Sequence, residues 1–207
     1  MYEREQIHAE AKNMKRIAAI LLAAGGSSRM GRSKQLIRFD DVSFVRRAVE
    51  TALSSRCDRL YVVVGAESSA ICTELEGIDV RIVPNPDWHK GIGSSIYAGI
   101  RAVRAENNTF DAALILLVDQ PAINVALLDE MIQKFEEGSA LVASSYADSV
   151  GVPALFSKAY FEDLKNLPDD CGAKNLLQKH DAEVTRIPFP DGAFDIDTPT
   201  DLERLLK

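Results

Sequence analysis

The residues from Leu22 to Lys34 combine small side chains with positive charge, a pairing suited to holding phosphate groups. The stretch reads LAAGGSSRMGRSK, in which two glycines and two serines are followed by Arg29 and Lys34. Small residues let backbone N–H groups converge on an anion, and the two cations add charge to such a cradle. We therefore expect the loop to bind a polyphosphate. The alternative is a solvated turn whose charges only keep it soluble.

Two known phosphate-binding motifs come close to this loop without matching it. The dinucleotide fingerprint G-x-G-x-x-G is absent from it. The segment from Gly26 to Ser33 has the spacing of G-x-x-x-x-G-K-[ST], but Arg32 stands at the lysine position. An ordinary P-loop is therefore not expected.

Three aspartates could supply metal ligands near the bound phosphates. Asp119 ends the most apolar run of the chain and Pro121 stops that run, so the carboxylate is expected at the end of a strand. Asp195 and Asp197 lie two apart in an extended segment, so only one of them can readily face Asp119. Mg²⁺ commonly takes one or two carboxylates together with substrate phosphate. Each aspartate could instead cap a turn or a helix.

Alternating strand and helix patterns bring these residues to one edge of a predicted sheet. Strands are expected over 17–23, 59–65, 80–85, 112–121, 140–144, 152–157 and 182–189. Helices are expected over 43–55, 67–75, 94–105, 125–137, 158–166 and 173–180, and from 198 onward. The strand over 112–121, apolar on both faces, is expected to be central and parallel. This order predicts a three-layer α/β/α fold with a mostly parallel sheet.

Length and composition indicate one ordinary soluble domain. The chain has 207 residues and a net charge of −7, which argues against nucleic acid or a membrane as partner. Its three cysteines (Cys57, Cys72 and Cys171) lack C-x-x-C spacing and fit the reduced thiols of a cytoplasmic protein. We expect a disordered polar tail over residues 1–13 and a single domain over 14–207.

The loop resembles the L-A-[AG]-G-x-S-x-R-M-G-x-x-K signature of small nucleotidyltransferases. Among these it is most similar to the molybdenum cofactor cytidylyltransferases. Further blocks resemble those of the family in the same order: GIGSSIYAGI (91–100), LLVDQP (116–121), GVPALF (151–156), DDCGAK (169–174) and DIDTPTDL (195–202). The resemblance runs from Ile17 to the C-terminus, and it implies a Rossmann-like nucleotidyltransferase fold of the GT-A-like kind.

The resemblance implies an activity and a set of site residues. CMP would pass from CTP to molybdopterin with Mg²⁺ as cofactor, releasing pyrophosphate, and a molybdenum hydroxylase or its chaperone would make transient contact with the protein. Arg29 and Lys34 would be catalytic, while Asp119 and Asp197 would hold the metal. The residues expected to bind nucleotide are Leu22, Ala23, Ala24, Gly25, Gly26, Ser27, Ser28, Arg29, Lys34, Gly65 and Ser95.

Three of these positions bear on the nucleobase. Ala24 stands where guanylyl-transferring relatives typically carry glycine, and so resembles the cytidylyl branch. Ser95 is the expected base contact, within a helix whose first N–H groups are expected to be free, and Gly65 would allow the base to approach closely. The alternative is a capping serine with glycines that serve packing. Trp88 and His89 are assigned loop packing only.

Departures from the family pattern leave the acceptor open. Asp169 and Lys174 replace the glycine and arginine of G-D-x-G-A-R, and lysine lacks the bidentate fork of arginine. Val152 stands where the family often has histidine. Transfer of GMP or another NMP, to molybdopterin or to a sugar or alcohol phosphate, is therefore an alternative. A non-catalytic cofactor carrier is another, and it would not need the acid pair Asp119 and Asp197.

Overall fold

A mixed β-sheet forms the middle layer of the protein. The computed structural model describes residues 15–26, 33–107, 109–146, 149–193 and 201. Within them, seven strands form one sheet in the order β5-β4-β1-β6-β8-β7-β9. Their bounds are β1 Ile17–Ala23, β4 Arg59–Val64, β5 Arg81–Pro84, β6 Ala112–Leu117, β7 Leu141–Tyr146, β8 Ser149–Ser157 and β9 Val184–Pro188. Neighbours are parallel except around β8, which is antiparallel to both β6 and β7.

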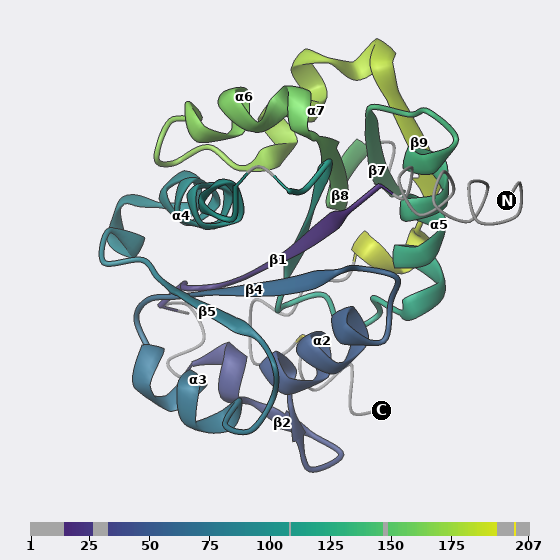
Figure 1. Ribbon diagram of the computed structural model, residues 1–207. Helices are drawn as coiled ribbons and strands as arrows, with labels where there is room; N and C mark the ends of the chain where they lie inside the picture. The colour runs from purple at the N-terminus through teal and green to yellow at the C-terminus, as the bar shows by residue number, and fades with distance from the viewer. Residues whose placement is uncertain (1–14, 27–32, 108, 147–148, 194–200, 202–207) are drawn as a thin grey trace, which may run out of the picture.

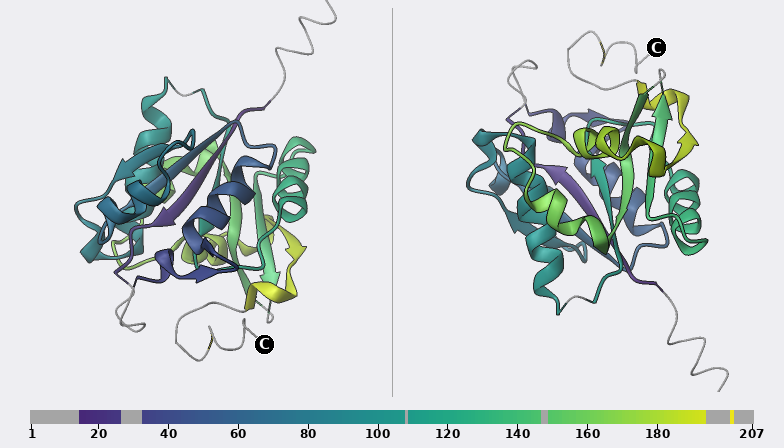
Figure 2. Two further views of the ribbon diagram at one scale, coloured as in Figure 1. Left: turned by 90° about the horizontal axis from the view of Figure 1, so that it is seen from below. Right: turned by 90° about the horizontal axis from the view of Figure 1, so that it is seen from above.

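Helices cover both faces of this sheet. One face carries α2 (Phe44–Leu53), α3 (Ser68–Glu74) and α5 (Val125–Glu136), and the other carries α4 (Ile92–Ala105), α6 (Phe161–Lys165) and α7 (Ala173–Lys179). Figure 1 shows α4, α6 and α7 above the sheet with α2 and α3 below it, and Figure 2 shows the same layers from both sides. The predicted three-layer α/β/α arrangement with a mostly parallel sheet is confirmed.

Both faces of strand β1 are covered, which explains its unbroken apolar sequence. Ala19 and Leu21 pack into the core beneath α2, while Ala18 and Ile20 pack into the core beneath α4. All of its residues are buried. A strand covered on both faces needs an apolar side chain at every position rather than at alternate ones.

The strand expected over 112–121 differs from β6 in two ways. It stops at Leu117, because the chain turns between that residue and Pro121. It is parallel to β1 as expected, but its other neighbour, β8, is antiparallel. An apolar run indicates burial on both faces and carries no information on the direction of the neighbouring strand.

Smaller differences occur where elements are short. Strand β8 begins at Ser149, three residues before the expected start at Val152. The helix expected over 158–166 is a 3-10 turn, Lys158–Tyr160, followed by α6. A two-stranded hairpin, β2 (Arg38–Phe39) and β3 (Val42–Ser43), was not expected, because two-residue strands are too short to show a period. The tail over 1–13 and the start of the last expected helix lie outside the described residues.

The cysteines form no disulfide bond. Cys57, Cys72 and Cys171 are free thiols. Burial raises the pKa of Cys57 to about 11, so this thiol stays protonated and unreactive near neutral pH. Among the helices of the described ranges, none has the length and apolar character needed to cross a membrane.

Candidate active site

A cavity of about 310 Å³ opens at the carboxyl ends of β1 and β6. Cavities of this size hold small ligands, and this sheet edge is where open α/β folds bind them. The walls come from the loop after β1, the segment that follows residue 33, the first turn of α4 and the turn after β6. Seven of the predicted site residues lie on these walls: Leu22, Ala24, Gly25, Gly26, Lys34, Ser95 and Asp119.

The remaining predicted residues lie elsewhere or outside the described ranges. The side chain of Ala23 packs into the core beneath α2, on the opposite face of β1 from Ala24. Gly65 directly follows β4 and is not on the cavity wall. The predicted site residues Ser27, Ser28, Arg29 and Asp197, together with the alternative Asp195, fall outside the described part of the chain, so their roles stay predictions.

Lys34 and Asp119 form an ion pair at the cavity. Lys34 Nζ donates to Asp119 Oδ2, and the two side chains are only 18% and 17% exposed. The second carboxylate oxygen, Oδ1, is buried and receives no hydrogen bond within the described structure. A buried acceptor without a donor, close to the glycine loop, fits a ligand of a divalent cation.

The described residues do not supply a complete metal site. No group of three or more His, Cys, Asp or Glu side chains within them is placed to hold a metal ion. Magnesium sites often combine one or two carboxylates with water and substrate phosphate. A single aspartate at this position can therefore supply one ligand of such a site. The partnership of Asp119 with Asp197 stays a prediction.

Gln35, which the sequence analysis missed, fixes the junction between β1 and the glycine loop. It is 2% exposed, and its Nε2 donates to Gly25 O at 2.7 Å and to Ala23 O at 3.3 Å. Its Oε1 accepts from Ser33 Oγ at 2.8 Å. Because the N–H of a trans peptide points opposite to its carbonyl, the Gly26 N–H faces away from Gln35. A glutamine next to a lysine looks exposed in sequence, and no pattern signals its burial.

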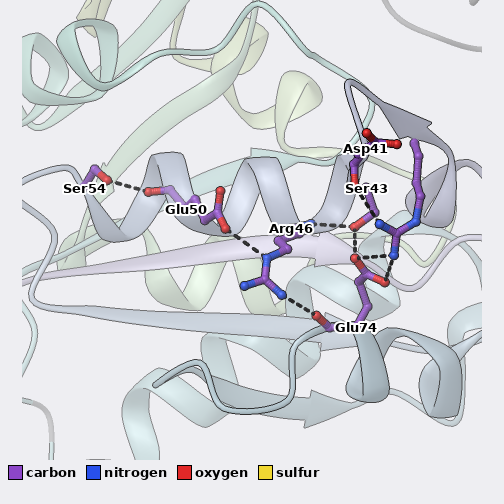
Figure 3. Close-up of polar contacts among 7 residues, drawn as sticks. Asp41, Ser43, Arg46, Glu50, Ser54 and Glu74 are labelled. Carbon is purple, nitrogen blue, oxygen red and sulfur yellow. Dashed lines mark hydrogen bonds and ion pairs between the residues drawn. The ribbon is translucent and has the colours of Figure 1, made fainter.

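The segment that carries Lys34 is anchored by polar contacts beneath the site. It forms the 3-10 helix η2 (Lys34–Leu36) and leads directly into the β2–β3 hairpin. Glu74, at the end of α3, accepts from Arg38 at 2.9 Å and from Ser43 Oγ at 2.9 Å, and its backbone carbonyl accepts from Arg46 at 3.4 Å (Figure 3). These bonds join the hairpin, α2 and α3, and thereby fix the hairpin that directly follows η2 and Lys34.

Trp88 and His89, to which the sequence suggested only packing, both line the cavity. A β-carbon on Gly65 would lie 2.6 Å from Trp88 Cβ, and one on Gly26 would lie 3.1 Å from Cζ3 of the indole. Both glycines therefore make room for the indole, and contact of Gly65 with a nucleobase stays a prediction. Trp88 and His89 lie just after β5, at the edge of the sheet where ligands bind. That position was the sequence signal that could have placed them at the cavity.

The start of α4 is less open than the sequence suggested. The Gly93 N–H donates to Asp169 O at 2.8 Å, and a β-carbon on Gly93 would lie 2.2 Å from Pro168 O. The expectation that the first N–H groups of this helix are free is therefore wrong at Gly93, where glycine serves the close packing of the 168–169 loop. Ser95, one turn into the helix, lies on the cavity wall, and its contact with a nucleobase stays a prediction.

A second cavity, of about 660 Å³, lies at the same edge of the other half of the sheet. Tyr146 and Ser149, at the turn between β7 and β8, line it together with Gln178 and Arg186. Arg186 is paired with Asp181. Because β7 and β9 run parallel to β6 and β1, their carboxyl ends share the edge that bears the first cavity.

The sequence pattern of the MobA-like NTP transferase domain matches residues 19–184. The chain belongs to the MobA-like NTP transferase family. The resemblance found in the motifs is thus confirmed, and with it the assignment of the protein as a nucleotidyltransferase.

Curated relatives of this MobA-like protein carry several names. It is 31% identical to the purine catabolism protein PucB of Bacillus subtilis over 92% of its own length and 96% of the relative's. The nicotine blue oxidoreductase of Paenarthrobacter nicotinovorans is 29% identical over the same shares. The molybdenum cofactor cytidylyltransferase of Escherichia coli is 25% identical over 91% of this chain and 94% of the relative. Proteins named molybdenum cofactor guanylyltransferase also match.

Solved structures share the fold. A homologue of Mycobacterium tuberculosis Rv0371c, from Mycobacterium sp. strain JC1, superposes with a TM-score of 0.80 at 29% identity, covering 93% of this chain and 96% of that one. Rv0371c itself, in complex with manganese, gives a TM-score of 0.76 at 25% identity, covering 93% and 98%. The predicted Rossmann-like nucleotidyltransferase fold is confirmed.

Proposed function

We propose that this chain transfers CMP from CTP to molybdopterin with Mg²⁺, releasing pyrophosphate and forming molybdopterin cytosine dinucleotide. The observation that carries the proposal is the convergence of the Gly25–Gly26 loop, Lys34 and Asp119 on one cavity. Backbone donors, a cation and a metal-ligating carboxylate are the groups that a nucleoside triphosphate requires. Nucleotidyl transfer belongs to the family, whereas the choice of base, acceptor and metal is proposed.

The protein's part in the reaction is positioning and charge stabilisation. A phosphate oxygen of the acceptor attacks the α-phosphorus and forms the new P–O bond, while the bond to pyrophosphate breaks in line with it. Because this nucleophile is already anionic, little deprotonation is needed. Lys34, with Arg29, neutralises charge that develops on the α-phosphoryl group and on the leaving pyrophosphate. The loop amides hold the β- and γ-phosphates.

Asp119, together with Asp197, is proposed to hold the magnesium ion. The buried Oδ1 of Asp119, which lacks a donor, supports this role. Bound there, the metal would supply Lewis-acid stabilisation of the α-phosphate. The related Rv0371c has been solved in complex with manganese, which supports a divalent ion of this kind.

The choice of CTP rests on Ala24. This residue is buried on the cavity wall, where its methyl group takes space that glycine would leave to a purine. Relatives named cytidylyltransferase and guanylyltransferase both match, so GMP transfer is the alternative. Those names support molybdopterin as the acceptor, and a sugar or alcohol phosphate is the competing choice. We place the reaction in the cytoplasm, with a molybdenum hydroxylase or its chaperone receiving the product.

The deciding experiment measures pyrophosphate released from each of the four NTPs with Mg²⁺, with and without molybdopterin. We expect release from CTP that depends on molybdopterin. Preference for GTP would overturn the choice of base. Release that needs a sugar phosphate in place of molybdopterin would overturn the acceptor, and binding without release would point to a carrier.

A further inference from the structure

A buried asparagine, Asn85, stands behind the cavity wall. It is 4% exposed and lies just after β5. The Asp87 N–H donates to Asn85 Oδ1 at 3.0 Å, and this bond fixes which way the amide faces. Asn85 Nδ2 therefore points at two serine hydroxyls of α4, Ser94 Oγ and Ser95 Oγ, each at 3.0 Å. Both amide hydrogens are used, one for each serine.

The two serines differ in where their own protons go. Ser94 Oγ lies 2.7 Å from Gly91 O and 3.0 Å from Asp87 O, so its proton is donated within the protein. Ser95 Oγ accepts from Asn85, and no acceptor for its own proton occurs in the described structure. Ser95 lines the active-site cavity, whereas Ser94 lines a separate cavity beside α4. The Ser95 proton is thus left for a ligand.

We propose that Asn85 is a positioning residue that makes Ser95 a hydrogen-bond donor toward the nucleobase. The inference rests on the proposed function, since it takes the base to be the group beside Ser95. Cytosine presents acceptors at N3 and O2, whereas the corresponding edge of guanine presents N–H donors at N1 and N2. A hydroxyl held as a donor matches cytosine and opposes that edge of guanine.

The substitution Asn85→Asp tests this assignment by reversing polarity at constant shape. A carboxylate accepts on both oxygens, so both serine hydroxyls turn to donate to it, and Ser95 then offers only lone pairs to the cavity. Three donors around the carboxylate keep it ionised. We expect CTP to bind about tenfold more weakly, with GTP losing less, because one hydrogen bond has been replaced by an unfavourable contact.

Binding is read from the fluorescence of Trp88, the chain's only tryptophan and a residue of the cavity wall. Each of the four NTPs is titrated with Mg²⁺ into the wild type, Asn85→Asp, Ser95→Ala and the double variant. Ser95→Ala should also weaken CTP binding about tenfold. The double variant should bind CTP no more weakly than Ser95→Ala does, because Asn85 acts through the hydroxyl that is already missing.

Ser94→Ala is the matched control. It removes the other hydroxyl partner of Asn85, from a serine that is not on the cavity wall, and should leave CTP binding unchanged. If Asn85→Asp weakens CTP binding equally with and without the Ser95 hydroxyl, the inference is overturned. In that case CTP binding by the wild type would still leave the proposed function standing. A wild type that binds no NTP would overturn both. If Asn85→Asp does not fold, the two serine variants decide. Equal losses of CTP affinity in Ser94→Ala and Ser95→Ala overturn the inference, and a loss of CTP affinity confined to Ser95→Ala supports it.

Discussion

The two halves of the sheet are built differently at the edge they share. In the first half, β5, β4, β1 and β6 are all parallel. Two buried amides support the cavity there, because Gln35 lines it and Asn85 donates to Ser95 on its wall. In the second half, the antiparallel β8 interrupts the sheet, and the cavity there is larger and lined by exposed groups such as Arg186. Buried polar contacts restrict geometry, whereas exposed ion pairs restrict it little.

This difference indicates a division of labour between the halves. The described residues that match the nucleotidyltransferase signature, 22–26 and Lys34, lie in the first half. Two of the three departures from the family pattern, Val152 on β8 and Lys174 on α7, lie in the second half, whereas the third, Asp169, accepts from the Gly93 N–H of α4 in the first half. We interpret the first half as the nucleotide site and the second as the side that selects the acceptor. Substitutions in each half test this division.

The largest effect is expected at Asp119. Asp119→Ala removes the proposed metal ligand and should lower kcat by at least about 10²–10³-fold, the loss typical of a removed charge-stabilising group, without loss of fold. Pyrophosphate release across a Mg²⁺ titration and a thermal melt measure the two quantities. The control Asp181→Ala removes an exposed aspartate of the second half and should leave the KM for CTP unchanged. Near-normal turnover by Asp119→Ala would remove this residue from the metal site.

The same assay separates the two aspartates outside the described residues. Asp197→Ala should behave like Asp119→Ala, whereas Asp195→Ala should be milder. The reverse order would show that the wrong member of the pair was chosen.

Lys34→Ala should cost about 2–4 kcal/mol in kcat/KM, with kcat falling more than KM rises, because its charge is needed most in the transition state. Arg29→Ala should act in the same way. Lys174→Ala, an exposed lysine of the second half, is the control and should leave the KM for CTP unchanged. An effect of Lys34→Ala on KM alone would mean simple phosphate binding.

Gln35→Leu should destabilise the protein by about 1–3 kcal/mol, because the carbonyls of Ala23 and Gly25 lose their donor. The KM for CTP should rise as the loop loosens. Urea unfolding and initial rates measure the two effects. Gln178→Leu, at an exposed position of the second half, should change stability by no more than about 0.5 kcal/mol. Equal effects of the two substitutions would contradict the contrast between the halves.

Ala24→Gly should raise kcat/KM for GTP relative to CTP by a few-fold, because it removes the methyl group that narrows the pocket, while CTP stays the better substrate. The ratio of the two values is the measurement. A parallel fall for both nucleotides would instead mean that the alanine only supports the loop.

The smallest effect is expected from Arg186→Ala. Its exposed ion pair with Asp181 should contribute less than about 1 kcal/mol to stability, and the KM for CTP should not change. A clear rise in that KM would place nucleotide contacts in the second half and end the proposed division.

Sequence alone was sufficient wherever local chemistry sets the outcome. Strand β1 was predicted to the residue, because burial on both faces demands an unbroken apolar run. The glycine loop, Lys34 and Asp119 could be expected at one edge, since parallel strands carry their carboxyl ends to the same side. The motif blocks then identified the family without any knowledge of contacts.

Tertiary structure decided what depends on residues meeting across the fold. The direction of β8 leaves no trace in its pattern of apolar residues, since parallel and antiparallel neighbours bury the same faces. The burial of Gln35 and Asn85 depends on which elements cover them, and a polar side chain in a loop looks exposed in sequence. Trp88 reached the cavity wall because Gly26 and Gly65, on two other segments, leave room for its indole. Such contacts arise only from packing, which a one-dimensional pattern does not encode.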